Sequence, residues 1–223
     1  STKNELYIKE LKQMKKYPKD IFYKGDLSLL EKRKVSIVGT RKPNSYSKQY
    51  TFKIANELSK RGIIIVSGAA IGVDAIAHNA AGSNNTIAVL ANGLDIKYPA
   101  INSKLITSIE NNGLVLSTYK DGEKARNYTF VHRNEIVVSL GEILIVTHAD
   151  EKSGTLTSIN YALEMGKKVY TIPHRLNESL GTQKLINQGL IKPIYDLEEF
   201  LNSFGVINQN INEVDTYINS FPL

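Results

Sequence analysis

The sequence predicts an α/β fold: a Rossmann-like, doubly wound and mostly parallel sheet with a short helical N-terminal extension. Short apolar runs, typical of strands that are buried on both faces, alternate with polar or mixed segments of helical length. Each of these segments closes with glycine, where the last turn of a helix would end. With 223 residues, 42% of them apolar, the chain is long enough to bury one substantial core.

Six strands are predicted after residue 34. Each is a run of four or five residues, rich in the β-branched and apolar residues that favour buried strands. The runs are VSIV at 35–38, IIIV at 63–66, TIAVL at 86–90, LVLS at 114–117, ILIVT at 143–147 and KVYTI at 168–172.

The segments between the strands are predicted to be helices, because a glycine stands where each helix would stop. Glycine adopts the left-handed conformation of a helix C-cap without the steric cost that a side chain brings. The first helix is expected to be capped by Ser45 or Ser47. The predicted stops are Gly62, Gly82, Gly113, Gly141, Gly166 and Gly189.

These elements divide the chain into three parts. Residues 1–34 form a basic N-terminal extension, residues 35–195 the Rossmann-like domain, and residues 196–223 a C-terminal helix and tail, too short for a complete extra domain. The extension holds ten basic and five acidic residues, so it carries most of the net charge of +6. This arm is interpreted either as a solvated surface helix or as a surface that contacts phosphate. The pI of 9.2 favours a nucleic-acid partner.

Several classes of protein are disfavoured by composition. The chain has no cysteine, which excludes disulfides, cysteine metal sites and a cysteine nucleophile, and its four histidines offer little for a metal. No metal and no cofactor are therefore expected. No apolar run approaches the roughly 20 residues that cross a bilayer, and the N-terminus lacks the apolar core of a signal peptide. We expect a soluble, cytoplasmic protein without membrane contacts.

Three loops follow predicted strands and begin predicted helices. In an open parallel sheet such loops gather at one edge, where ligands bind, and helix N-termini attract anions. None of them has the G-x-G-x-x-G or G-x-x-x-x-G-K-[ST] pattern of a nucleotide site, so a sugar-phosphate chain is a better ligand than one clamped nucleotide. The candidate binding residues are Gly39, Thr40 and Arg41 in the first loop, Ser67, Gly68 and Gly72 in the second, and Ser153, Gly154 and Thr155 in the third.

A fourth segment, ARNYTFVHRNEIVVSL at 125–140, mixes aromatic and basic residues ahead of a predicted helix. This mixture suits single-stranded nucleic acid, whose bases stack on rings while its phosphates meet cations. Arg126, Arg133 and Asn134 are candidate contacts. Phe130 is interpreted either as a stacking platform or as core, whereas Tyr128 is expected to pack in the core.

No catalytic residue is expected. The chain has no G-x-S-x-G elbow, and no serine has an identifiable histidine and carboxylate beside it. Asp74 and His78 stand four residues apart on one predicted helix, where a pair more often stabilises the helix or orders the neighbouring glycine loop than acts as a dyad.

Seven stretches between residues 17 and 195 share their order with one known family. They are YPKDIFYKGDLSLLEKRKVSIVGTRK, GIIIVSGAAIGVDAIAHNAA, TIAVLANGLDIKYPAINSKLI, GLVLSTY, FVHRNEIVVSL, SGTLTSINYALEMGKKVYTIP and GTQKLINQGLI. Together they resemble the DNA-processing protein A family, also called DprA or Smf.

The resemblance implies a homodimeric Rossmann-like protein without catalytic turnover. It implies binding and protection of incoming single-stranded DNA, and loading of RecA recombinase during natural transformation, with double-stranded DNA as an open alternative ligand. It places the three candidate loops on the family's phosphate-contacting motifs. Phe130, Arg133 and Asn134 match the family's aromatic residue and the Arg-Asn pair that follows it.

Five positions depart from the family pattern. Glu135 replaces a cation after the Arg-Asn pair, and Ala100 stands where a lysine is frequent, with Lys97 and Lys104 as substitutes. Thr147, His148 and His174 also differ, which is expected to alter the strand end beneath the third loop and the turn after residue 172.

Two other functions compete with DNA binding. A Rossmann-like nucleoside-monophosphate phosphoribohydrolase of the Lonely-guy type needs carboxylates shortly after the third loop, but Thr157 and Ser158 stand there. A pure oligomerisation scaffold would leave Arg41 and the anion-binding loops without a role.

Overall fold

The computed structural model describes residues 6–205. Within this range the chain forms one sheet of eight strands, in the order β1-β5-β4-β3-β2-β6-β7-β8. Neighbouring strands are parallel except β1 and β5, which are antiparallel. The predicted class, a mostly parallel and doubly wound α/β sheet, is confirmed. The predicted tail at 206–223 lies outside the described residues.

All six predicted strands are present, and each predicted end is correct to within one residue. Two further strands, β1 and β8, lie at the edges of the sheet. The strands are β1 Phe22–Gly25, β2 Lys34–Val38, β3 Ile64–Ser67, β4 Thr86–Leu90, β5 Leu114–Ser117, β6 Leu144–Val146, β7 Val169–Thr171 and β8 Lys192–Pro193.

Helices connect the strands as predicted, and none of those in the described part of the chain is both long and apolar enough to cross a membrane. Three short 3-10 segments, η1 Lys9–Gln13, η2 Leu27–Glu31 and η3 Ala100–Asn102, add to them. The α-helices are α1 Ser45–Lys60, α2 Val73–Ala81, α3 Ser103–Asn112, α4 Asn127–Leu140, α5 Thr155–Glu164, α6 Leu180–Asn187 and α7 Leu197–Ser203.

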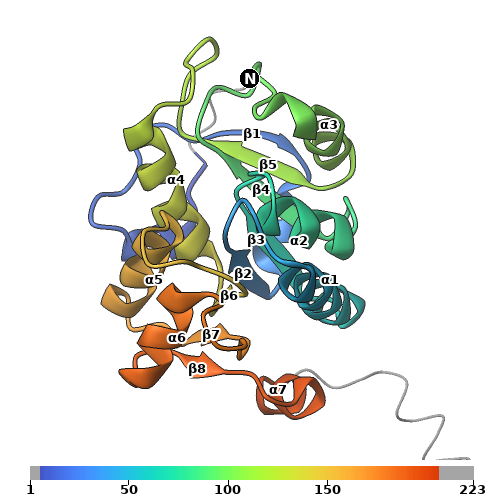
Figure 1. Ribbon diagram of the computed structural model, residues 1–223. Coiled ribbons are helices and arrows are strands. Elements are labelled where there is room, and N and C mark those ends of the chain that lie inside the picture. Colours follow the sequence, from blue (N-terminus) through green and yellow to red (C-terminus); the bar gives the residue numbers. More distant parts are fainter. Residues whose placement is uncertain (1–5, 206–223) are drawn as a thin grey trace, which may run out of the picture.

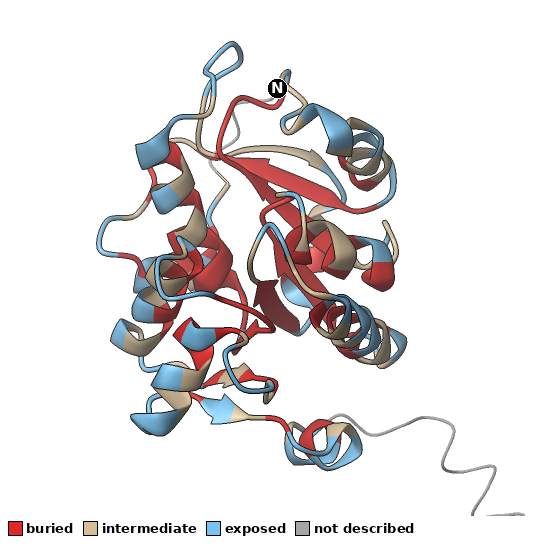
Figure 2. Cartoon of the chain, in the orientation of Figure 1, coloured by how far each residue is buried: buried red, intermediate tan, exposed pale blue. Residues whose placement is uncertain are grey.

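The sheet is covered on both faces, by α1, α2 and α3 on one side and by α4 and α5 on the other (Figure 1). Successive residues of a strand point to opposite faces. In β3, Ile64 and Val66 accordingly pack in the cluster beneath α4 and α5, whereas Ile65 packs beneath α1 and α2. The strands other than the edge strands β1 and β8 form the buried centre of the molecule (Figure 2). This double burial explains why the strands read as continuous apolar runs.

The N-terminal segment is built into the domain rather than projecting from it. Leu11 and Met14 are buried in the same cluster as α4 and α5, and β1 extends the sheet antiparallel to β5. Lys34 is also buried, with its ammonium donating to the carbonyl groups of Leu30 and Lys32 and pairing with Glu10. Part of the basic charge of this segment is therefore used inside the protein.

All six predicted glycines stand after a helix, but glycine is required there for two different physical reasons. Gly62, Gly82, Gly166 and Gly189 have positive φ angles, as expected of left-handed C-caps. Gly113 and Gly141 have negative φ angles. They are glycine because backbone and side-chain atoms of the neighbouring strand region occupy the place of a Cβ atom.

We expect Gly113→Ala to reduce the free energy of unfolding by about 1–3 kcal/mol, the usual cost of overpacking a core. The added Cβ would lie 2.7 Å from the carbonyl oxygen of Thr86, a backbone atom that cannot move aside cheaply. Urea denaturation followed by circular dichroism measures the loss. Gly154→Ala is the matched control, because Gly154 has an ordinary φ of −59° and open space around the new methyl group. Equal stability of both variants would contradict the packing argument.

Candidate functional site

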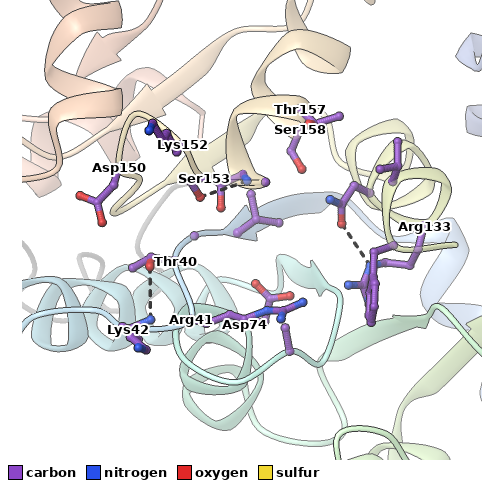
Figure 3. A pocket seen from close by; sticks show the side chains of 18 of the residues that line it. Thr40, Arg41, Lys42, Asp74, Arg133, Asp150, Lys152, Ser153, Thr157 and Ser158 are labelled. Carbon is purple, nitrogen blue, oxygen red and sulfur yellow. Dashed lines mark hydrogen bonds between the residues drawn. The ribbon is translucent and has the colours of Figure 1, made fainter. Parts of the chain in front are cut away.

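A pocket of about 580 Å³ lies at the carboxyl ends of β2 and β6, beside the predicted loops. The chain continues from β2 in one direction across the sheet and returns to β6 on the other side, so this is the point where strand order reverses. The first loop lines one wall, the third loop lines the opposite wall, and α4 closes one end (Figure 3). A backbone hydrogen bond of 2.9 Å from Thr40 N to His148 O ties the two walls together.

The first loop presents its predicted residues to the pocket. Gly39 allows close packing on α2, since a Cβ atom there would lie 2.6 Å from Val73. Thr40 and Arg41 line the pocket, and Thr40 Oγ1 accepts a hydrogen bond from the backbone of Lys42. This bond shapes the turn that places the two cations at the pocket wall.

The cap of α1 differs from the prediction of Ser45 or Ser47. Asn44 caps the helix, with its side-chain oxygen accepting from Ser47 N at 2.8 Å. The hydroxyl of Ser47 instead lies 2.9 Å from His148 Nδ1, in a buried contact beneath the third loop.

The predicted residues of the second loop support the site rather than lining the main pocket, which Ala70 of the same loop and Asp74 at the start of α2 do line. The hydroxyl of Ser67 is buried and donates to Ile37 O at 2.6 Å. Gly68 leaves room for the guanidinium of Arg133, because a Cβ atom would lie 2.7 Å from its Cζ. Gly72 has a φ of +83° and packs against the backbone of the first loop. The sequence predicted all three residues as DNA contacts, and in the structure they contact other parts of the protein instead of lining the main pocket.

Asp74 and His78 order the second loop, as one interpretation of the sequence proposed. Asp74 Oδ2 accepts from Gly68 N at 3.1 Å, and His78 Nε2 accepts from Ala69 N at 3.2 Å. The hydroxyl of Thr86 donates to a backbone carbonyl, so His78 Nδ1 donates to it and the ring is neutral. Burial lowers the pKa of His78 to about 3, which keeps it neutral.

The third loop lies across the pocket from the first, as predicted. Ser153, Gly154 and Thr155 all line the pocket at the start of α5. Ser153 Oγ accepts from Thr155 N at 3.1 Å. Gly154 requires neither a positive φ nor close packing, because a Cβ atom would meet nothing within 4 Å. Its missing side chain therefore leaves space in the pocket itself.

The aromatic and basic segment lies on α4, not ahead of a helix as predicted. Phe130 and Asn134 line the pocket, whereas Arg126 stands at the N-cap, exposed and outside the lining. Tyr128 is 62% exposed, so its expected place in the core is wrong. Residues 128, 130 and 134 are thus distributed around the helix, and only part of the segment faces the pocket.

Two guanidinium groups lie close to the ring of Phe130. The Cζ atoms of Arg41 and Arg133 are 5.4 and 5.5 Å from its centroid, and the ring of Tyr98 lies 6.1 Å away. Phe130 also borders a smaller apolar cavity of about 60 Å³ that continues toward Pro99. The ring is only partly covered, and it separates the main pocket from this cavity.

Arg133 lines the pocket, but most of its side chain is buried. It is 6% exposed, and its Nη1 donates to Gly68 O at 2.5 Å and to Val89 O at 3.1 Å. Its Nε donates to Asn134 Oδ1, which orients the amide. Burial lowers the pKa of Arg133, and the nearby charge of Asp74 partly offsets this. Burial likewise raises the pKa of Asp74, against the effect of Arg133.

Several residues that line the pocket were not predicted from the sequence. Lys42 and Lys152 add two cations, Asp150 adds a carboxylate, and Asn127 adds an amide at the start of α4. Lys42 adjoins Arg41, and Lys152 adjoins Ser153. A charged residue next to a predicted glycine loop could therefore have pointed to these cations.

The departures from the family pattern have different consequences. Glu135 is buried away from the pocket and accepts from Lys15 N at 2.9 Å, so its charge does not face the site. Lys97 pairs with Glu110 and is not a free substitute for a cation at position 100. His148 and His174 pack beneath the third loop with their rings 5.3 Å apart.

His174 and Thr147 are joined by a hydrogen bond that braces the same loop. His174 Nε2 lies 2.8 Å from Thr147 O and must donate, since a carbonyl only accepts. The hydroxyl of Thr147 pairs with that of Thr51 on α1. Within residues 6–205, no group of three histidine or acidic side chains could hold a metal ion.

Comparison with known proteins identifies close relatives. The sequence model of the DNA recombination-mediator protein A family matches residues 1–205. The DNA processing protein DprA of Bacillus subtilis is 36% identical over 208 residues, which is 91% of this chain and 70% of that protein. The chain spans 46% to 70% of the length of the curated relatives that it matches.

Two solved structures are also similar. DNA processing protein A from Helicobacter pylori, described for its single-stranded DNA binding mode, has a TM-score of 0.89 and 39% identity, covering 91% of this chain and 94% of that one. DprA from Streptococcus pneumoniae has a TM-score of 0.82 and 35% identity, covering 89% and 71%.

We expect Arg133→Met to lower the free energy of unfolding by about 3–5 kcal/mol, the cost of leaving a buried partner charge uncompensated. The substitution removes both carbonyl contacts and leaves Asp74 without the nearby cation. Adding Asp74→Asn should restore part of the loss, because the amide is neutral. A double-mutant cycle by urea denaturation measures this coupling. Strict additivity of the two substitutions would show that the charges do not interact.

We expect the protein to lose stability as the pH falls below 6.5, in part through His78. Its pKa is about 3 in the folded protein against an ordinary value of 6.5, so between these values the unfolded chain binds a proton that the folded protein excludes. The contribution is at most about 1.4 kcal/mol per pH unit and levels off near pH 3. The measurement is the free energy of unfolding, from urea denaturation at several pH values between 4 and 8. Its slope against pH should be shallower for His78→Gln, which does not titrate, than for the wild type. Equal slopes for the wild type and His78→Gln would contradict this contribution of His78.

Proposed function

Because this chain belongs to the DNA recombination-mediator protein A family, we propose that it binds single-stranded DNA in the pocket between its first and third loops. We further propose that it acts in natural transformation as a homodimer, protecting incoming DNA and loading RecA recombinase onto it. The function requires no turnover. The pocket supports the DNA-binding step, and the remaining steps are proposed from the family.

The observation that carries the proposal is the combination of cations and free space along the pocket. Arg41, Lys42 and Lys152 line it, and the N-terminal end of the ten-residue helix α5 opens into it. Cations and a helix N-terminus both favour phosphate groups. Gly154 leaves room for a backbone to approach that end of the helix.

Phe130 supplies a surface for a base. Its ring borders the main pocket and the smaller apolar cavity, close to Tyr98 and Pro99. Stacking on such a ring contributes about 1–3 kcal/mol per base and tolerates any sequence. A strand with its phosphates in the pocket thus has an aromatic platform within reach.

No arrangement in the pocket favours glycosidic hydrolysis. Thr157 and Ser158 line the pocket where the hydrolase would need acidic residues. Of the carboxylates present, Asp74 is held by Gly68 N and Asp150 lies 3.5 Å from His148 Nε2. The enzyme would bind a free mononucleotide, whereas the proposed function requires a strand of DNA, so the ligand distinguishes the two functions.

The direct test is fluorescence anisotropy with labelled dT oligonucleotides of increasing length, in a salt series, with AMP and a DNA duplex as competitors. Length-dependent, salt-sensitive binding that AMP does not displace is the expected result. Binding or cleavage of AMP with no affinity for the oligonucleotide would replace the proposal by the enzyme alternative. RecA filament formation on DNA coated with a single-strand-binding protein then tests loading.

We expect Arg41→Gln to reduce the steepness of log K against log salt by about 0.7, the effect of one lost phosphate contact on a single strand. Arg41 is exposed, so stability should change by less than about 0.5 kcal/mol. The same anisotropy assay, with a denaturation control, measures both quantities. An unchanged slope together with unchanged affinity would remove Arg41 from the DNA contact.

A further inference from the structure

A second groove adjoins the pocket on the side of the first loop that faces α1 and α2. Its volume is about 570 Å³. Arg41 and Lys42 line both hollows, so the first loop forms a ridge between them. Lys48 on α1, together with Gly72 and Ile76, lines only the second hollow, which is here called the α1–α2 groove. The two helices that form its floor lie side by side (Figure 1).

The charge of the α1–α2 groove is wholly positive. Its lining contains three cations and no carboxylate. In the part of the chain that the structure describes, Arg41, Lys42 and Lys48 form no ion pair with a carboxylate. The cations at the other end of α1 behave differently, because Lys60 and Arg61 both pair with Glu57. The groove therefore keeps its cations free for an external anion.

The opposite side of the pocket is less favourable for a polyanion. Asp150 lines the pocket beside the third loop, and Glu151 follows it in an exposed position. A negatively charged strand that left the pocket on this side would meet these two carboxylates, which repel it, together with Lys152 and with Lys184, which pairs with Glu151. The lining of the α1–α2 groove offers three cations, Arg41, Lys42 and Lys48, and no carboxylate.

We propose that single-stranded DNA continues from the pocket across the first loop into the α1–α2 groove, where Lys48 contacts its phosphate backbone. The inference rests on the proposed function and deepens it by giving the strand a direction and a second subsite. A chain with a negative charge at every nucleotide gains from each further cation along its path. The groove supplies such a cation directly beside the two that the pocket already uses.

Phe52 gives this path an aromatic continuation. It lies four residues after Lys48 on α1, which places both side chains on one face of the helix. Phe52 is 50% exposed, so its ring is accessible to a ligand. A cation followed by an exposed ring is the combination that binds single strands without sequence preference. Phe52 is therefore placed to stack on a base of the emerging strand.

The test compares three lysine variants on dT oligonucleotides from 3 to 15 nucleotides long, by anisotropy in a salt series. Lys48→Gln should bind the shortest oligonucleotides with the affinity of the wild type. Above a threshold length it should bind more weakly than the wild type. On long ones the salt slope should drop by about 0.7, which is about a 2.6-fold smaller loss of affinity for each fourfold rise in salt. Lys152→Gln, which alters the pocket, should weaken binding at every length. Lys53→Gln is the matched control, exposed on the same helix but outside both hollows.

Three results would overturn the inference. Lys48→Gln binding every length like the wild type would show that the groove is empty. An equal defect at all lengths, or an equal defect in Lys53→Gln, would show that charge acts at a distance and not by contact. These results are distinct from failure of the proposed function, in which the wild type binds no oligonucleotide of any length.

Discussion

The buried guanidinium of Arg133, hydrogen bonded to the carbonyl groups of Gly68 and Val89, is the interaction on which the rest of the site depends. A buried charge is costly unless its donors are satisfied, so the second loop must lie where its carbonyl can reach that group. The same requirement excludes a side chain at position 68. Phe130 stands one turn earlier on α4, so the position of its ring follows from that of Arg133.

The remaining loops are braced against one another in the same way. The bond from Thr40 to His148 joins the first and third loops, and Gly72 brings the second loop against the first. Buried polar groups such as His78 hold the backbone, while exposed cations face the pocket. The site thus separates its two tasks between two sets of residues: one fixes the shape of the walls, and the other is left free to meet a ligand.

Most of the fold could be predicted because double burial leaves a strong signal. The apolar runs and glycine stops located six strands, whereas β1 and β8 were missed, since the edge sequences FYKG and KP carry no such pattern. The pocket was anticipated in its first and third loops. A sequence pattern does not reveal which way a side chain points, so it did not show that Ser67 and Arg133 are largely buried, although Arg133 also lines the pocket. Tyr128 was misplaced for the same reason.

If single-stranded DNA follows the proposed path over the first loop, the ridge gives a physical reason to favour single strands over duplexes. The hollows on its two sides share Arg41 and Lys42, so a chain that occupies both must turn sharply over a few residues of protein backbone. A single strand bends at little cost. Duplex DNA, with a persistence length of about 50 nm, resists curvature on this scale. On the proposed path the ligand itself must bend, so its stiffness would decide which nucleic acids bind.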